Sequence, residues 1–164
     1  MNRSFRVGII LAWALTLSVA GYLVWGYEKT LREGQLVLLR LLPNDPRSLM
    51  QGDYMALEYA MDQRLVDLPG PLPAYVYVQL GDGARGVFAG VGEQLRVEPG
   101  LISIRIRQRR ARPSVGPNAF FFEEGSESLY ETARWGGVRV AHDGTALLTS
   151  LYDDDLQLLG KNRR

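Results

Sequence analysis

A serine, Ser48, and the single histidine, His142, are of the types that nucleophilic catalysis uses. The pKa of a serine hydroxyl is too high for attack on a substrate unless a neighbouring base takes the proton. His142 is the single histidine, and its position between two β-like runs predicts a solvated turn. No local signature joins Ser48, His142 and an aspartate into a triad. The sequence therefore predicts no catalytic residue.

Residues 48–53 (SLMQGD) are similar to the turn after the nucleophile in signal-peptidase-like Ser-Lys hydrolases. In those enzymes a serine precedes the position of Ser48 by four residues, where this chain has Asn44. The lysine base also has no counterpart, because the only lysines, Lys29 and Lys161, flank the β-like part of the chain. A degenerate or atypical hydrolase with a signal-peptidase-like β-fold is therefore the alternative function.

The sequence lacks the residues of the common metal and redox sites. It contains no cysteine, which excludes disulfides and thiolate ligands. Asp153, Asp154 and Asp155 are adjacent, so they lack the spaced carboxylates and the glycine of a calcium loop. We expect no metal site and no cofactor, and the sequence specifies no small-molecule ligand.

A run of arginines is the main charge feature. Arg105, Arg107 and Arg109 alternate with isoleucines in residues 101–109, which predicts a strand with one buried face and one wet face. The wet face is either simply solvated or a basic patch for anionic lipid head groups or an acidic partner loop. The net charge of the chain is +1, so no overall field selects nucleic acid, and we expect no nucleic-acid partner.

The N-terminal region predicts one membrane-spanning helix. Residues 7–27 contain no charged side chain, and this length matches what a helix needs to cross a bilayer. Arg3 and Arg6 precede the run and Glu28 follows it, which predicts a cytoplasmic N-terminus (residues 1–6) and a periplasmic domain in a bacterial inner membrane. The alternative is a signal peptide cleaved after Ala20, which sends the domain to the same side.

From residue 35 onward the hydrophobic pattern has a period of two, which is typical of strands. Residues 28–34 predict a short linker or a helical extension, and residues 161–164 a tail. We expect a mainly β domain over residues 35–160, a barrel or sandwich with α+β character and one late helix. The strands are expected at residues 35–42, 55–61, 75–80, 87–91, 101–109, 119–122, 138–141 and 145–151, with a loop over 112–117 and the helix over 127–135. The expected core includes Leu57, Tyr59, Ile102, Ile104 and Ile106.

Residues 52–59 fit the pattern GDYxxLxY without a departure, through Gly52, Asp53, Tyr54, Leu57 and Tyr59. The chain thus resembles the bacterial GDYXXLXY-domain family. Residues 45–49, 120–125 and 137–156 are similar to further blocks of that family, so the likeness covers most of residues 34–160. The resemblance implies an N-terminal membrane segment and no established activity. Genes of the family often lie beside one for a multi-span membrane protein, so it also implies such a partner.

The motif itself predicts a rigid corner between a loop and a strand. Pro46 restricts the backbone, Gly52 can adopt a positive φ, and Asp53 can accept a hydrogen bond from the turn. Asp45 and Arg47 can pair, or Arg47 can hold Asp53. Leu57 and Tyr59 are expected on one face of the strand and Tyr54 on the other. The corner serves the fold alone or presents an interaction surface, and the leading hypothesis is a non-catalytic accessory protein anchored in the membrane.

Overall fold

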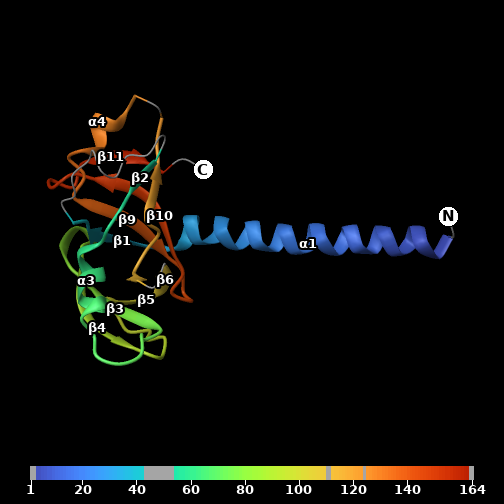
Figure 1. The fold of residues 1–164 in the computed structure, drawn as a ribbon, viewed down its shortest axis with the longest axis horizontal. Coiled ribbons are helices and arrows are strands. Elements are labelled where there is room, and N and C mark those ends of the chain that lie inside the picture. The colour runs from blue at the N-terminus through green and yellow to red at the C-terminus, as the bar shows by residue number, and fades with distance from the viewer. Residues whose placement is uncertain (1–2, 43–53, 110–111, 124, 163–164) are drawn as a thin grey trace.

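A computed structural model describes residues 3–42, 54–109, 112–123 and 125–162, and it has one long helix that carries a β-rich domain (Figure 1). Helix α1 (Arg3–Glu33) projects from the domain as a straight stalk. Within Ile9–Glu33 an 18-residue window has a mean hydropathy of 1.8, and none of that window is buried inside the protein. The helix is therefore long and apolar enough to span a membrane. Residues 28–33 continue it, so the helical extension is correct and the separate linker is not.

A four-stranded antiparallel sheet begins directly after the helix, in the strand order β1-β9-β10-β11. The strands are β1 (Gln35–Arg40), β9 (Trp135–Val140), β10 (Ala146–Tyr152) and β11 (Leu158–Lys161). The turn predicted at His142, between the strands at residues 138–141 and 145–151, is confirmed as the β9–β10 connection. Gly144 has a φ of +84°, a conformation that glycine adopts without a steric penalty.

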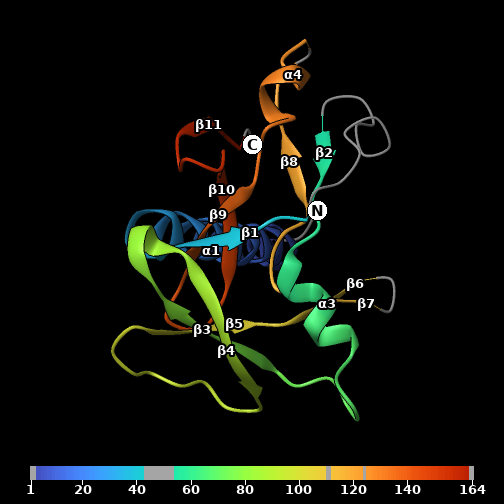
Figure 2. The ribbon, with the colours of Figure 1, turned by 90° about the vertical axis from the view of Figure 1, so that its left-hand side faces the viewer.

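A three-stranded antiparallel sheet, in the order β4-β3-β5, lies beside the first (Figure 2). Its strands are β3 (Tyr75–Leu80), β4 (Gly86–Gly92) and β5 (Leu101–Arg105), and the short 3-10 helix η1 (Asp82–Ala84) joins β3 to β4. The strand and turn predicted from residue 75 to residue 91 are thus confirmed.

The predicted strand over residues 101–109 is wrong in one respect, because it is broken at Ile106. Tyr75, the first residue of β3, pairs with Arg105, and the Ile106 amide donates to the carbonyl oxygen of Ala74 at 2.9 Å. The chain beyond Ile106 no longer runs along β3. It instead forms β6 (Arg107–Arg109), which pairs with β7 (Arg112–Ser114) in a separate hairpin. The loop predicted over residues 112–117 is therefore wrong for its first three residues.

The segment after the GDYxxLxY pattern also differs from the prediction. Strand β2 (Tyr54–Ala56) pairs with β8 (Ala119–Phe121), and the chain then enters helix α3 (Ala60–Val66) instead of continuing as a strand to residue 61. The alternation of apolar residues does not distinguish these outcomes over so short a run, since Met61 and Leu65 lie on one helical face.

The late helix is shorter than predicted. Helix α4 (Glu127–Tyr130) ends before Trp135, which begins β9 and pairs with Arg40 and Tyr152 on the neighbouring strands. The predicted end of the helix, at Trp135, therefore belongs to the sheet. The prediction of a mainly β domain with a late helix, after one N-terminal helix, is confirmed.

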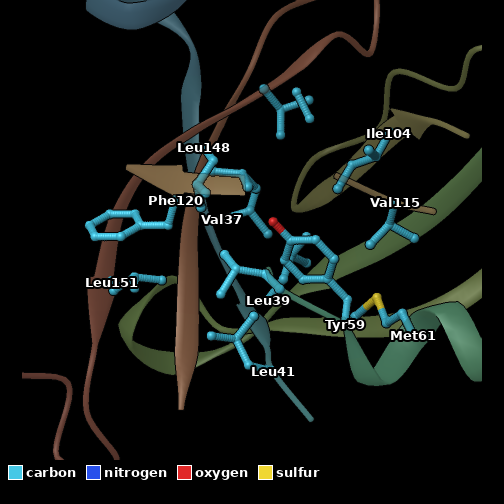
Figure 3. Close-up of a cluster of buried hydrophobic side chains, with 14 of the residues drawn as sticks. Val37, Leu39, Leu41, Tyr59, Met61, Ile104, Val115, Phe120, Leu148 and Leu151 are labelled. Atoms are coloured by element: carbon cyan, nitrogen blue, oxygen red, sulfur yellow. The ribbon is translucent and has the colours of Figure 1, made fainter. Parts of the chain in front are cut away.

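One hydrophobic core joins the sheets and α3 (Figure 3). Of the five expected core residues, Leu57, Tyr59 and Ile104 are buried, whereas Ile102 and Ile106 are partly buried against the cluster. The largest fully buried side chains come from six strands, from the residue before α3 and from the loop after β7. They are Tyr59, Phe120, Leu39, Ile104, Leu151, Val37, Val76, Val78, Val115 and Val138.

Candidate functional site

Tyr59, the last residue of the GDYxxLxY pattern, lies at the centre of the core (Figure 3). Its side chain is fully buried, and its hydroxyl donates a hydrogen bond of 2.6 Å to the carbonyl oxygen of Pro117. Two glycines make room for the ring: a Cβ on Gly116 would lie 3.0 Å from its atoms, and one on Gly136 would lie 3.2 Å from it. Burial, assisted by Asp62 and opposed by Arg107, raises the pKa of Tyr59 far above its ordinary value, so the hydroxyl stays a donor.

The other described motif residues are also placed by packing. Leu57 is buried, and its amide donates to the carbonyl of Asn118 at 2.7 Å. Tyr54 is half-buried on the opposite side, where its ring lies 5.9 Å from that of Phe121 in the paired strand β8. The described half of the motif therefore fixes a strand and a helix entrance against the core, and it presents no row of reactive groups.

The remaining motif residues lie outside the described residues. These are Asp45, Pro46, Arg47, Gly52 and Asp53, together with Ser48. Their assignment to a rigid corner or an interaction surface stays a prediction.

Asp62 forms a polar junction between α3 and the β7 segment, which the sequence analysis missed. Its carboxylate accepts hydrogen bonds from the Val115 amide at 2.8 Å and from the Ser114 hydroxyl at 3.0 Å. Burial raises the pKa of Asp62 above its usual 3.8, although these hydrogen bonds and one from the Tyr59 amide pull it down. The last bond is half of a capping box, because Asp62 is the third residue of the helix.

We expect Asp62 to make stability depend on pH. Because its pKa is higher in the folded state, the folded chain binds more protons between the unfolded and folded pKa values. The free energy of unfolding should therefore fall as the pH rises from about 3.8 through the folded pKa. Asp62→Asn removes this dependence on pH. The free energy of unfolding of the variant should therefore increase, relative to that of the parent, as the pH rises.

Urea unfolding of both proteins from about pH 4 to about pH 7 would measure this shift. Asp67→Asn, at the end of the same helix, controls for the removal of a carboxylate. A difference between Asp62→Asn and the parent that does not change with pH would contradict the raised pKa.

His142 lies exposed in the β9–β10 turn. The neighbouring Asp143 binds Thr145, through its amide at 2.9 Å and its hydroxyl at 2.9 Å. Burial alone would raise the pKa of Asp143, but these hydrogen bonds and Arg105 lower it overall. Within residues 3–42, 54–109, 112–123 and 125–162, no three His, Asp or Glu side chains are grouped so that they could hold a metal ion.

The structure brings two of the three patch arginines to the same hairpin. The Arg105 guanidinium lies 3.4 Å from the Tyr75 hydroxyl and 3.5 Å from the carbonyl oxygen of Asp143. Arg107, on the separate strand β6, donates to the carbonyl of Ala146 at 3.1 Å. The side chain of Arg109 lies outside the described residues. Both described arginines thus support the β9–β10 turn, and a role in binding lipid or a partner stays a prediction.

A second charged cluster was missed because it depends on strand register. Arg40 on β1 and Trp135 on β9 are cross-strand partners, and the Arg40 guanidinium lies 5.1 Å from the indole centroid. Arg85 lies 5.8 Å from the same ring, and Arg40 pairs with Asp154 at 3.1 Å. We call Arg40, Arg85, Trp135 and Asp154 the distal surface, because it lies away from α1. Strand β1 begins next to α1 at Gln35, and Arg40 lies about 17 Å further along the strand.

The distal surface has the chemistry of a protein contact site. Arginine and tryptophan are the residues that most often dominate binding energy at interfaces. The two guanidiniums are exposed, and Asp154 pairs with one of them, Arg40, so the surface can also bind a carboxylate of another chain. The indole beneath them is 8% exposed, so it gives the surface a rigid base.

Comparison with known proteins assigns the family. The model of the GDYXXLXY protein family matches residues 16–151, a stretch that begins inside α1 and ends in β10. No curated protein and no solved structure matches this chain. The matched region contains the second half of the apolar helix and nearly all of the β-rich domain. The chain therefore belongs to the GDYXXLXY protein family.

Proposed function

We propose that this protein is a non-catalytic accessory subunit, anchored by α1 in a bacterial inner membrane, whose periplasmic domain binds a multi-span membrane protein. The observation that carries the proposal is the short junction between helix and domain. Only Gly34 separates α1 from β1. The domain is thus held at the membrane surface, within reach of other membrane proteins.

Close packing supports a rigid junction. The Gly34 amide donates to the Thr30 carbonyl at 2.9 Å, and the Arg139 guanidinium donates to the Gly34 carbonyl at 2.8 Å. A Cβ on Gly34 would clash with the Thr30 carbonyl oxygen and would lie 3.2 Å from the Val140 carbonyl oxygen, so a larger residue would disturb the packing of α1 against β9. A domain on such a junction cannot search far from the bilayer for a soluble partner.

The charge bias of the N-terminal region predicts that the β-rich domain lies in the periplasm, and fusion proteins test this placement. A phosphatase that is active only outside the cytoplasm should be active at the C-terminus of the full chain. A fluorescent protein that folds only in the cytoplasm should be dark there. The arginines before the span and Glu28 after it give this expectation. The reverse pattern would contradict the periplasmic placement.

The partner is tested by affinity purification of the tagged full chain from native membranes in mild detergent, followed by mass spectrometry. We expect a multi-span protein to be recovered with the wild-type chain. Arg85→Ala should lower that recovery at least fivefold if the distal surface is a binding hot spot worth more than about 1 kcal/mol. Arg47→Ala should also lower recovery, as expected for a charged residue beside the predicted corner.

Arg64→Ala is the matched control, because Arg64 is also exposed and lies 5.3 Å from the Phe88 ring elsewhere on the domain. It should leave recovery unchanged. Melting temperatures of all variants separate lost binding from lost folding. Full recovery with well-folded Arg85→Ala and Arg47→Ala would show that the partner binds elsewhere, and recovery of no membrane protein would refute the accessory role.

A further inference from the structure

A groove lies between the end of α1 and the β9–β10 turn. It has a volume of about 490 Å³, and α1 contributes one wall through residues between Tyr22 and Glu33. The other wall consists of Ala141, His142, Asp143 and Thr145. The turn therefore lies alongside the helix and does not point away from it.

The groove straddles the border of the membrane span. The uncharged run of α1 ends at Tyr27, and Glu28 is the first charged residue after it. Tyr22 and Glu33 are about 16 Å apart along the helix, with this border near the middle. Trp25 and Tyr27 are exposed at this level, where tryptophan and tyrosine typically meet lipid head groups. With α1 placed across a bilayer, the β9–β10 turn, which lines the same groove, would stand at the head-group level.

The two halves of the groove differ in polarity, as the two parts of a phospholipid do. The half toward the membrane centre contains the exposed side chains of Tyr22, Leu23 and Trp25. On α1 the other half contains Lys29 and Glu33, and the turn adds His142 and Asp143 to the lining of the groove. The occupant that fits is a molecule with an apolar part inside the bilayer and a charged part at its surface.

The charged side chains that line the groove are one cation and two carboxylates. Lys29 and Glu33 lie 3.9 Å apart, and Asp143 is the second carboxylate. This set suits a zwitterion better than an anion. The carboxylates also favour an ammonium that donates hydrogen bonds, which a quaternary ammonium cannot do.

We propose that the groove between α1 and the β9–β10 turn binds a phosphatidylethanolamine-type lipid. Its ammonium would lie at Glu33 and Asp143, its phosphate at Lys29, and an acyl chain along Tyr22 and Leu23. This site rests on the membrane span alone and does not require the protein partner or the periplasmic orientation.

Native mass spectrometry of the full chain in detergent tests the lipid. The protein is mixed with equimolar phosphatidylethanolamine, phosphatidylcholine and phosphatidylglycerol, and the retained lipids are counted. We expect phosphatidylethanolamine to be retained preferentially by the wild-type chain. Glu33→Gln should lower this retention about threefold, the effect of removing one partly exposed charge pair. Asp155→Asn, an exposed carboxylate outside the groove, should not change it.

Equal retention of the three lipids, or unchanged retention in Glu33→Gln, would overturn the proposal and leave only non-selective lipid around the helix. The depth of the turn is measured separately in bilayers. Because the chain has no cysteine, a spin label can be attached at His142→Cys and, for comparison, at Asp154→Cys on the distal surface. The first label should be accessible to oxygen and protected from a water-soluble relaxation agent. Equal exposure of both labels to that agent would also overturn the proposal.

Discussion

Tyr59→Ala is expected to lower the free energy of unfolding by about 3–5 kcal/mol, the range for removing a buried aromatic ring from a core. The ring is fully buried between Gly116 and Gly136, and backbone atoms do not collapse readily into the space that it leaves. The substitution also leaves the Pro117 carbonyl without its donor. Urea unfolding of the full chain in mild detergent, followed by the fluorescence of Trp135 in the domain, measures the loss.

Two further variants separate the ring from the hydroxyl. Tyr59→Phe keeps the packing and loses only the hydrogen bond to Pro117, which should cost about 1–3 kcal/mol because a buried carbonyl is left unpaired. Tyr54→Ala removes the other tyrosine of the motif, which is half-buried, and should cost less than Tyr59→Ala. If the two alanine variants were equally stable, Tyr59 would not be the anchor of the motif.

Ile104→Ala is expected to cost about 2–5 kcal/mol. Ile104 is fully buried on the central face of β5, opposite Val76 of β3. Deletion of its side chain leaves a cavity between the three-stranded sheet and the rest of the core. The midpoint and slope of urea unfolding, compared with the parent, give the size of the effect.

Ile102→Ala is the matched control on the same face of the same strand. Ile102 is only partly buried, so the expected loss is smaller than for Ile104→Ala. An unfolding midpoint of Ile104→Ala equal to that of the parent would contradict the burial of this strand face. A larger loss of stability for Ile102→Ala than for Ile104→Ala would contradict the assignment of Ile104 as the more deeply buried residue.

The local sequence was sufficient to predict the structure where a single local pattern determined it. The uncharged run of residues 7–27 determines the apolar helix, because a helix pairs the backbone groups of its interior within the segment itself. The Asp143-Gly144 pair determines the β9–β10 turn, since only glycine adopts the required φ without strain. The GDYxxLxY pattern determines the family and, through Leu57 and Tyr59, part of the core.

The contacts between distant segments decided the rest. The strand predicted over residues 101–109 breaks at Ile106, where its pairing along β3 ends with Arg105 opposite Tyr75 and the Ile106 amide on the Ala74 carbonyl. Trp135 belongs to a strand, not to the preceding helix, because β1 and β10 pair with it on both sides. Arg40 and Trp135 are 95 residues apart, and only the register of β1 and β9 brings them together.

The same distinction applies to the candidate sites. The sequence identifies His142 as a turn residue, but it does not show that this turn lies against the end of α1. Likewise, the spacing of Asp62 and Ser114 contains no sign that the carboxylate would join α3 to the β7 segment. Periodicity and turn residues act within a few residues and so determine local elements and the membrane span. The groove, the distal surface and the surroundings of Tyr59 arise from packing between elements, which only the tertiary structure determines.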